Sequence, residues 1–579
     1  MIKNKAVNIK IISHLIVYIS VIVFFSNCAH ISSPTGGPKD PNPPEVVSYQ
    51  PENYSTNFIP QKISVEFNEF ITLKDVNNQV IISPPVEEKP DFKIRGKSLV
   101  FNLNEELLEN TTYTIFFGDA IRDNHEGNIL NNFEYVFSTG NTLDSLSIAG
   151  EVLNSFTLQP EEGVYVMLYE DVSDSIPLKE RPMFLSKTDK NGKFFINNLK
   201  NKKFKIFALR DNNNNYIYDL PNEQIAFSDT LISPEYIEII KPDTINTDSL
   251  ASDNIQPDSI FTDTIIQHYA HLFLFEEIDS TQKVENATLV KKGEIEFAFR
   301  FPTINAEIRA LNHDFDKNWK IEELSRKKDT LRIWLNNVDV DTIFFEVSDD
   351  GQVIDTNRIV LRKKERERER RKKEKEETER IIITSNVQNS FLELNQPCKL
   401  SFPYPLKKYN FNEIIIQEDS LPIRAEFIFK DSVKRKVFVD FDWKEESKYS
   451  ILIPDSIFLD IQNLSNDTTI FELKTRKMSD YGTLLMEIKI SDSCSQFIIQ
   501  LLDDKENLLS EKIISKSELL KFEYLKPQSY KIKAIIDSNR NSRWDNGDYL
   551  KKIQPENVYY FPKSIQIRAN WDIEEEWAL

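Results

Sequence analysis

Cysteine, histidine and glycine are scarce in this sequence, which has 3 Cys, 6 His and 13 Gly among 579 residues. Cys28 follows an N-terminal apolar run, so only Cys398 and Cys494 remain for the body of the chain. Two cysteines in so long a chain do not make a disulfide framework. We expect both to be buried as small apolar residues.

The same scarcity excludes the common catalytic signatures. The sequence contains no Gly-x-Ser-x-Gly, no His-Glu-x-x-His, no Cys/His spacing for a metal and no glycine-rich phosphate loop. Its 92 acidic residues could still pair as carboxylates for hydrolysis, but most Asp and Glu are surface groups. The sequence therefore predicts that the protein is not an enzyme.

Charge and composition limit the fold and the partners. The formal net charge of -20 weighs against nucleic acid as a partner, because nucleic-acid-binding surfaces are basic. The 39 Phe and 20 Tyr, with many Ile and Val, favour strands over helices. At roughly 100 to 200 residues per domain, the length predicts four or five domains.

Residues 1–28 form a separate unit, in which three lysines precede an apolar run that ends at Phe25 and leads to Cys28. The run is shorter than the roughly 20 residues that span a bilayer as a helix, so we interpret residues 1–27 as a signal peptide. Its end resembles a bacterial lipobox of the looser kind found in Bacteroidetes, although Asn27 stands where Gly or Ala is usual. The resemblance implies that Cys28 is acylated and anchors the chain. The alternative is an ordinary secreted signal with an incidental cysteine.

Residues 28–45 are rich in Pro, Gly and Ser and indicate a stalk that follows the lipid anchor. Residues 46–140 then show short alternating apolar runs separated by turn sequences, a pattern typical of a β-sandwich. Four motifs follow in order: Phe67-Asn68-Glu69, Asn110 to Thr114, Asp123 to Asn128, and Phe137 to Gly140. Together they resemble the S-layer type of bacterial Ig-like domain found in Bacteroidetes lipoproteins.

Acidic and amide side chains in this domain suggest two interpretations. Asp119, Asp123, Glu126 and Asn128 could hold a metal. A hydrogen-bonded hairpin turn also explains them, because Asp, Asn and Gly cluster in turns for local backbone reasons. We favour the turn.

Residues 141–236 contain IAGEVLNS, VYVMLYED, TDKNGKFFINNL and FKIFALRD. They resemble the transthyretin-like or carboxypeptidase-regulatory-like sandwich, in which Asp189 to Gly192 is a hairpin turn. Part of this region recurs 326 positions later: Phe204 to Asp219 reads FKIFALRDNNNNYIYD and Tyr530 to Asp545 reads YKIKAIIDSNRNSRWD. A period this long indicates repeated domains rather than a solenoid.

The repeat predicts a second pair of domains. Residues 483–579 carry the second copy of the loop and indicate a second transthyretin-like sandwich. Residues 381–482 indicate a second Ig-like domain, in which Lys399 to Phe402 replaces Ser64 to Phe67, and Phe471 to Thr475 replaces Tyr135 to Thr139. The order of Ig-like and transthyretin-like domains thus occurs twice.

The repeated loop has the form Asp-x-Asn-x-Asn-x-x-aromatic-Asp. Oxygens at positions 1, 3, 5 and 9 resemble a calcium loop, because Ca²⁺ prefers several oxygen ligands on one turned segment. Position 6, where Gly is expected, is Tyr216 or Ser542, and position 12 is Asn222 or Asp548. The alternative is a metal-free loop whose Asx side chains accept bonds from its own backbone. The candidate calcium ligands are Asp211, Asn213, Asn215 and Asp219 in the first copy, and Asp537, Asn539, Asn541, Asp545 and Asp548 in the second.

Residues 237–265 are rich in Asp, Ser and Thr, and Asp recurs every five residues from Asp243 to Asp263. This spacing matches neither a helix nor a strand, so we interpret the segment as a linker. Four triplets resemble the Asp-Ser/Thr-aliphatic sequon for O-glycosylation in exported Bacteroidetes proteins. The candidate residues are Thr244, Ser249, Ser259 and Thr264. The alternative is a bare acidic linker.

Two further segments complete the chain. Residues 266–360, beginning near HLFLFEE, return to strand-like runs and indicate another Ig-like sandwich. Residues 361–380 form a charged segment, with eleven basic and seven acidic side chains from Arg362 to Arg380, and i,i+4 pairs that favour a solvated helix. It is either a spacer helix or disordered insertion, or a basic probe for anionic lipopolysaccharide or an acidic partner.

The sequence therefore predicts an all-β protein of tandem Ig-like and transthyretin-like β-sandwiches, with one charged helical insertion. The resemblances imply a lipid anchor in the outer membrane of a Bacteroidetes-like bacterium, on a leaflet that the sequence does not identify. We predict a non-enzymatic scaffold or accessory subunit that docks on an outer-membrane β-barrel or envelope complex for barrel assembly, secretion or uptake. The alternative is a surface glycan-binding or adhesive protein.

Overall fold

The computed structural model describes residues 39–237, 269–361, 380–491 and 496–579, apart from residues 278, 280 and 337. The predicted signal peptide, Cys28, Cys494, the charged segment and the linker residues Thr244, Ser249, Ser259 and Thr264 lie outside the described residues. The chain forms two compact units. Unit 1 comprises Met1–Leu153 and Gln159–Leu274, and unit 2 comprises Asn154–Leu158 and Phe275–Leu579.

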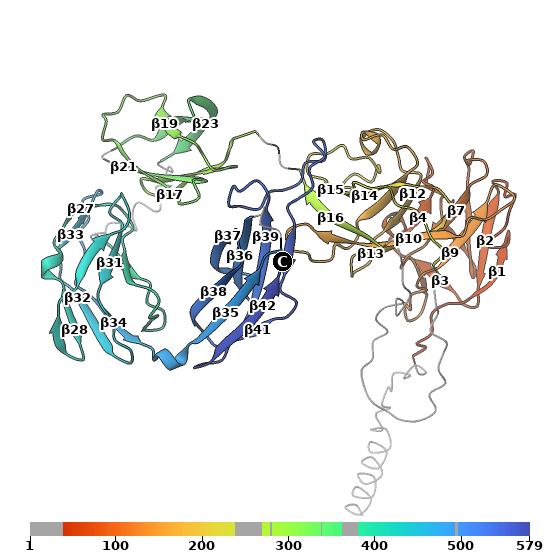
Figure 1. The fold of residues 1–579 in the computed structure, drawn as a ribbon. Helices are drawn as coiled ribbons and strands as arrows, with labels where there is room; N and C mark the ends of the chain where they lie inside the picture. Colours follow the sequence, from red (N-terminus) through yellow and green to blue (C-terminus); the bar gives the residue numbers. More distant parts are fainter. Residues whose placement is uncertain are drawn as a thin grey trace, which may run out of the picture. The chain divides into compact units, whose positions relative to one another are not determined.

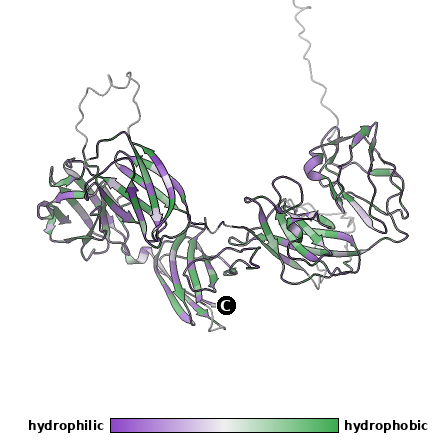
Figure 2. Ribbon diagram, turned by 90° about the horizontal axis from the view of Figure 1, so that it is seen from above, coloured by the Kyte–Doolittle hydropathy of each residue, from purple (hydrophilic) through white to green (hydrophobic). Residues whose placement is uncertain are grey.

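Both units are built of β-sandwiches (Figure 1), so the predicted all-β fold is confirmed. The strands form because apolar and polar side chains alternate along them, as Figure 2 shows. In β2 (Lys62–Phe67), for example, Ile63, Val65 and Phe67 are buried while Lys62 and Glu66 are exposed. Among the described residues the α-helical structure is limited to the four residues of α2 (Val76–Gln79).

Sandwich 1, residues 46–140, has one sheet in the order β1-β2-β6-β5 and a second in the order β4-β7-β9, with β3 paired to β8. Its core includes Phe67, Phe101 and Tyr135. Besides β2, the strands are β1 (Val46–Gln50), β3 (Ile71–Leu73), β4 (Ile81–Ser83), β5 (Lys93–Arg95), β6 (Ser98–Asn102), β7 (Thr112–Phe116), β8 (Ile121–Asp123) and β9 (Glu134–Ser138).

Sandwich 2, residues 146–276, joins seven strands in the order β12-β11-β14-β15-β16-β10-β13. The Asp189 to Gly192 turn connects β12 to β13, but β12 pairs with β11 and β13 with β10, so the turn does not close a hairpin as predicted. The strands are β10 (Leu146–Asn154), β11 (Tyr165–Tyr169), β12 (Phe184–Lys187), β13 (Lys193–Leu199), β14 (Lys205–Arg210), β15 (Gln224–Phe227) and β16 (Ala270–Glu276), with the 3-10 helix η1 (Ile176–Leu178).

The position of β16 corrects the predicted start of the third sandwich at residue 266. The HLFLFEE run belongs to the sheet of sandwich 2, where it lies between β10 and β15. Leu272 and Leu274 are buried in the core of that sandwich. Alternation predicts a strand and its buried face, but it does not identify the partner strands, so the sequence pattern assigned this strand to the wrong domain.

Sandwich 3, residues 284–361, has sheets in the orders β17-β18-β21-β20 and β19-β22-β23. Ile295, Phe297 and Phe345 lie in its core. The strands are β17 (Val284–Lys291), β18 (Glu294–Phe299), β19 (Ala306–Ala310), β20 (Lys320–Leu324), β21 (Thr330–Leu335), β22 (Thr342–Asp349) and β23 (Gln352–Val360).

Sandwich 4, residues 381–475, repeats the topology of sandwich 1. Its sheets have the orders β24-β26-β31-β30 and β25-β34-β32-β28-β29, and β27 pairs with β33. The strands are β24 (Thr384–Ser385), β25 (Phe391–Leu392), β26 (Cys398–Ser401), β27 (Leu406–Tyr409), β28 (Ile415–Glu418), β29 (Leu421–Ile423), β30 (Glu426–Phe429), β31 (Lys436–Asp440), β32 (Lys448–Ile453), β33 (Phe458–Asp460) and β34 (Thr469–Thr475), with the 3-10 helix η2 (Phe411–Glu413).

Side-chain hydrogen bonds repeat between sandwiches 1 and 4 at an offset of 336 residues. The Tyr113 hydroxyl accepts a bond from the Leu108 backbone N–H at 2.9 Å, and the Tyr449 hydroxyl accepts one from Lys444 at 2.9 Å. Thr139 Oγ1 accepts a bond from the Thr111 N–H at 3.0 Å, and its equivalent Thr475 Oγ1 does the same for Ser447. Sandwich 4 is therefore a second copy of sandwich 1 in its side-chain contacts as well as in its strand order.

Sandwich 5, residues 482–579, has sheets in the orders β38-β35-β42 and β37-β36-β39-β40, and β41 also pairs with β39. In sandwich 2, β14 lies between β11 and β15, and here β39 likewise lies between β36 and β40. The strands are β35 (Gly482–Lys489), β36 (Gln496–Asp503), β37 (Leu508–Ile514), β38 (Glu518–Leu525), β39 (Ser529–Asp537), β40 (Val558–Tyr560), β41 (Ile565–Gln566) and β42 (Asp572–Ala578), preceded by the 3-10 helix η3 (Met478–Asp480).

Candidate functional site: the repeated Asp-Asn loops

The two Asp-Asn loops each follow a buried strand. Loop 1, Asp211 to Asp219, continues from β14, and loop 2, Asp537 to Asp545, continues from the end of β39. Both strands lie inside a sheet and pair on both sides. The start of each loop is therefore held by two neighbouring strands.

In loop 1 the side chains fold back on the backbone. The Asp211 carboxylate accepts N–H bonds from Asn213 at 3.0 Å, Asn214 at 2.6 Å and Tyr216 at 2.7 Å. Asn213 Oδ1 accepts a bond from the Asn215 N–H, and Asn215 Oδ1 accepts one from Ile217. The oxygens at positions 1, 3 and 5 thus all accept bonds from the loop itself.

Loop 2 repeats most of these contacts. The Asp537 carboxylate, which is fully buried, accepts N–H bonds from Asn541 at 3.0 Å and Ser542 at 2.8 Å. It also accepts a bond from the Gln496 side chain at 2.7 Å. Asn541 Oδ1 accepts a bond from the Arg543 N–H.

The closing aspartate is held in the same way in both loops. Asn213 and Asn215 donate their side-chain amides to the two carboxylate oxygens of Asp219, at 3.0 and 2.8 Å. The amides of Asn539 and Asn541 donate to the carboxylate of Asp545. The structure therefore brings positions 1, 3, 5 and 9 together, and each closing carboxylate contacts two amide donors.

Position 12 differs between the loops: the Asn222 carbonyl of loop 1 accepts a bond from the Asn212 side-chain amide at 3.0 Å, whereas in loop 2 the side chain at position 12 pairs with a lysine. The Asp548 carboxylate accepts the Lys551 N–H at 2.9 Å and forms an ion pair with the Lys551 ammonium at 2.7 Å. Burial opposes ionisation of Asp548, and the bonds from Lys551 outweigh it, so the pKa of this carboxyl lies below its usual value. The carboxylate of Asp548, a candidate calcium ligand, thus pairs with Lys551.

Two residues in each loop adopt the left-handed backbone conformation. At position 4, φ is +57° for Asn214 and +60° for Arg540, and at position 6 it is +62° for Tyr216 and +63° for Ser542. Position 6 is where a calcium loop carries glycine. The backbone bend expected there is present in both loops, although neither residue is glycine.

A glutamate that the sequence comparison missed supports each loop. Glu223 has no exposed surface, and its carboxylate accepts N–H bonds from Asn212, Asp219 and Leu220, each at 3.1 Å. Glu556 serves loop 2, accepting bonds from the N–H groups of Ser538 at 2.7 Å and Asp545 at 3.0 Å. Burial raises the pKa of the Glu556 carboxyl.

These contacts define the chemistry that the loops offer. Within the part of the chain that the structure describes, no three His, Cys, Asp or Glu side chains gather as a metal site. The Asx oxygens at positions 1, 3 and 5 already accept backbone donors, an arrangement that makes each loop a stable turn without a ligand. A Ca²⁺ ion would need Asn213 and Asn215, or Asn539 and Asn541, to turn their oxygens toward the closing carboxylate.

The other acidic cluster is a turn. Asp123 accepts N–H bonds from His125, Glu126, Gly127 and Asn128. Burial would raise the pKa of Asp123, but these four donors outweigh it and lower the pKa to about 2. The Asp119 backbone N–H donates to the Gln79 side chain. The structure shows the hydrogen-bonded turn that we favoured here.

The structure describes one of the two cysteines that follow Cys28. Cys398 is buried and free in the core of sandwich 4, and burial raises the pKa of its thiol to about 12. Cys494 lies outside the described residues. No helix in the described ranges is both long enough and apolar enough to cross a membrane.

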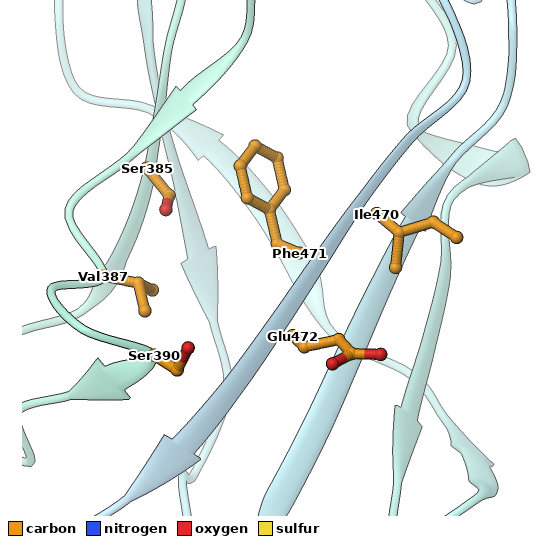
Figure 3. Close-up of a pocket in the computed structure, with 6 residues that line it drawn as sticks. All are labelled: Ser385, Val387, Ser390, Ile470, Phe471 and Glu472. Atoms are coloured by element: carbon orange, nitrogen blue, oxygen red, sulfur yellow. The ribbon is translucent and has the colours of Figure 1, made fainter. Parts of the chain in front are cut away.

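A hollow of 480 Å³ lies at the side of sandwich 4 (Figure 3). One wall is the segment from Ser385 to Ser390, and the other is the strand β34. The residues that line it are Ser385, Val387, Ser390, Ile470, Phe471 and Glu472. The sequence analysis gave no signal for it, because it depends on how two segments about eighty residues apart are paired.

Comparison with known proteins identifies one domain. Residues 40–139 match the bacterial Ig-like domain family. A search of the curated proteins found no match. The chain is thus a multi-domain protein of tandem β-sandwiches that contains a bacterial Ig-like domain.

Three similar solved structures are distant from this chain. The Bacillus cereus major pilin subunit BcpA is 8% identical, with a TM-score of 0.14, covering 75% of this chain and 99% of that one. Domains 1–6 of the surface layer protein SbsC are 9% identical, with a TM-score of 0.13, covering 90% and 67%. Bacteroides ovatus SGBP-B, in complex with a mixed-linkage heptasaccharide, is 8% identical, with a TM-score of 0.18, covering 73% and 92%. TM-scores this low give no basis for transferring function.

Proposed function

We propose that the protein is a non-enzymatic binding protein of the bacterial cell envelope, whose tandem sandwiches attach it to a partner at the cell surface. The observation that carries the proposal is the duplicated pair: sandwich 4 repeats the strand arrangement and the supporting hydrogen bonds of sandwich 1, and β39 of sandwich 5 has the same central place as β14 of sandwich 2. Duplicated modules provide repeated surfaces for contact with an extended partner. The match to a bacterial Ig-like domain supports this class of function.

In the first pair the two sandwiches contact each other directly. The Leu185 N–H in sandwich 2 donates to Ser83 Oγ in sandwich 1 at 3.0 Å. Asn198 donates its side-chain amide to Thr114 Oγ1 at 2.8 Å. Such bonds fix the two sandwiches relative to each other, so that the pair presents one defined surface.

The second pair is joined by a charged cluster around Glu393. The Tyr481 hydroxyl donates to the Glu393 carboxylate at 2.5 Å, and the Lys526 ammonium pairs with it at 2.8 Å. These bonds outweigh the effect of burial and lower the pKa of Glu393. The carboxylate thus joins the end of sandwich 4 to sandwich 5.

Sandwiches 3 and 4 also contact directly. Lys291 donates to the Pro403 carbonyl at 2.6 Å, and the Tyr404 hydroxyl donates to the Lys292 carbonyl at 2.8 Å. Trp334 of sandwich 3 is fully buried against Val433 and Ile461 of sandwich 4. Sandwiches 3 and 4 therefore pack directly on each other.

The finer parts of the proposal concern the anchor. Acylation of Cys28 would tether the chain to the outer membrane, and the Pro-rich segment that follows would separate the first sandwich from the lipid. We propose that the sandwiches then face a surface polymer or another cell, as an adhesive or glycan-binding protein.

A second candidate function is an accessory subunit of an outer-membrane complex for barrel assembly, secretion or uptake. The three packed joints favour it, because fixed sandwiches suit docking at several points. Purification of the native protein in detergent separates the candidates. A lone chain that binds surface polysaccharide or whole cells is expected for the adhesive protein, whereas a stoichiometric β-barrel partner with no such binding would replace it with the accessory subunit.

A further inference from the structure

In sandwich 1 the outer edge of β9 is covered by the chain's own N-terminal part. The Tyr54 N–H donates to the Val136 carbonyl at 2.7 Å, and the Val136 N–H donates to Asn53 Oδ1 at 2.7 Å. The Ser138 N–H donates to the Ser55 carbonyl at 2.8 Å. Ser55 forms an isolated parallel bridge with Phe137, next to Tyr54 with φ of +60°, so a turn of the chain covers this edge.

In sandwich 4 the equivalent edge of β34 is covered only in part. The Lys474 N–H donates to the Ser390 carbonyl at 2.8 Å, which reproduces the bond between Ser138 and Ser55. β25 continues this cover at the C-terminal end of β34, where Leu392 pairs with Thr475. Toward the N-terminal end of β34 the cover is lost, because Gln388 and Phe391 exchange backbone hydrogen bonds and close a tight turn. Asn389, with φ of +49°, and Ser390, with φ of +64°, provide the bend that turns the chain away.

The turn leaves a gap opposite Glu472. Glu472 lies 336 residues after Val136, so it occupies the position that Asn53 and Tyr54 cover in sandwich 1. Hydrogen-bonding directions alternate along a strand, so Lys474, Glu472 and Ile470 direct their backbone groups to the same edge. Among the described residues, no counterpart of Asn53 or Tyr54 reaches Glu472. The gap ends at Asn466, which pairs in parallel with Ile381.

The 480 Å³ hollow lies at this gap. Figure 3 shows the Phe471 ring on the side of Ser385 and Val387, while the Ile470 and Glu472 side chains point the other way. Ile470, the second residue of β34, is 60% exposed beside this gap. An unpaired strand edge with apolar neighbours is a template for another strand.

We propose that an extended polypeptide segment of a partner protein fills this gap and adds a strand parallel to β34. The occupant is a peptide rather than a glycan, because the equivalent position in the sister sandwich is covered by a peptide segment, through the Tyr54 N–H and the Asn53 side-chain oxygen. Its N–H donates to the Glu472 carbonyl and its carbonyl accepts the Glu472 N–H. This is β-strand addition, in which backbone bonds provide affinity and side chains provide selectivity.

The surroundings of the gap define the segment. A residue level with Phe471 points into the hollow beside Val387, so a side chain of moderate size that is apolar fits there. The neighbouring residue level with Glu472 points outward beside a carboxylate, so a basic side chain fits that position. This inference names a kind of partner for the proposed binding function, and it rests on that function because it assumes that the protein binds a partner.

The test selects peptides from a displayed heptapeptide library on the full-length protein and compares them with a Glu472→Pro variant. Proline removes the N–H that faces the gap and leaves the bonds to β32 on the other edge unchanged. We expect selected peptides with an apolar residue next to a basic one, and about a tenfold weaker affinity for Glu472→Pro, as the loss of one or two hydrogen bonds implies. Glu472→Ala keeps the N–H and serves as the matched control. It should lose less affinity than Glu472→Pro, and only through the lost contact with the basic residue of the peptide.

A second measurement does not depend on the folding of a variant. A selected peptide that is N-methylated at the residue level with Glu472 should bind the unaltered protein about tenfold more weakly than the parent peptide. Equal binding of both peptides, or selection of the same peptides by Glu472→Pro, overturns the proposal. Self-association of the protein that Glu472→Pro abolishes would make a second copy the occupant and also overturn it. If Glu472→Pro loses peptide binding but cells that carry it still attach to their partner, the proposed function holds and attachment does not use this site.

Discussion

Removal of the Glu223 carboxylate should destabilise sandwich 2 strongly. This side chain is fully buried and accepts three backbone N–H bonds that hold both ends of loop 1. Glu223→Ala leaves these three donors without their acceptor. At roughly 1 kcal/mol for each unsatisfied donor, the change should lower the free energy of unfolding by about 3 kcal/mol.

Two further variants show whether the carboxylate itself is responsible. Glu223→Gln retains one acceptor oxygen but places an amide group against a donor, so we expect about half the loss. Glu162→Ala removes an exposed glutamate of the same sandwich and should change stability by less than about 0.5 kcal/mol.

Calorimetry of the full chain and hydrogen exchange measure the effect together. The unfolding transition that includes sandwich 2 should move to lower temperature, and the amides of Asn212, Asp219 and Leu220 should exchange faster in Glu223→Ala. A transition that moves no further than in Glu162→Ala would refute the reasoning that this carboxylate supports the loop.

The remaining predictions concern loop 2, the anchor and the linker. Ser542→Gly should raise the stability of sandwich 5 by about 1 kcal/mol in a denaturant titration, because Ser542 adopts a φ of +63°, and no gain would show that the bend carries no cost. EDTA should leave the melting temperature unchanged, since the loop oxygens already accept backbone donors, whereas a fall that Asp537→Ala or Asp211→Ala abolishes would establish calcium. Cys28→Ser should leave an unprocessed or soluble chain in detergent partitioning, and full partitioning at mature mobility would exclude the lipid. Intact-mass analysis of the native protein should show hexose-bearing peptides if the linker is glycosylated, and unmodified peptides would exclude modification at Thr244, Ser249, Ser259 and Thr264.

Alternating patterns and the long repeat predicted much of the fold. The run before each Asp-Asn loop is a buried strand in both copies, because its apolar residues recur with the period of a strand. The match between Phe471 to Thr475 and Tyr135 to Thr139 also agrees with the structure, where β34 and β9 have equivalent places in their sheets.

Contacts between distant residues were the part that the sequence did not predict. Glu223 and Glu556 support equivalent loops, but Glu556 lies seven residues beyond the constant offset (223 + 326 = 549, against 556), so the repeat does not align them. A weaker signal was present in the Ig-like pair, where Glu-x-Thr/Ser-x-Tyr occurs at Glu109 to Tyr113 and at Glu445 to Tyr449. Its hydrogen-bonding role becomes clear only when the strands are placed.

The assignment of β16 differs from the sequence prediction, and Asp548 makes a contact that the sequence comparison did not identify. A strand pattern identifies a buried face but not the sheet that it joins, and β16 completes sandwich 2 after a long linker. Asp548 has the spacing of a twelfth-position ligand, yet Lys551 lies three residues away and pairs with its carboxylate. In both places, contacts with other residues determine the arrangement.

Protease treatment of intact cells tests the central claim most directly, because a protein that attaches to a partner at the cell surface must be accessible from outside. Cells that produce the native protein are treated with a protease that does not cross the outer membrane, and the chain is detected before and after the membrane is permeabilised. The account predicts that the chain is cleaved on intact cells, together with loss of binding to polysaccharide or to other cells. A chain that remains intact until the outer membrane is permeabilised would contradict the account.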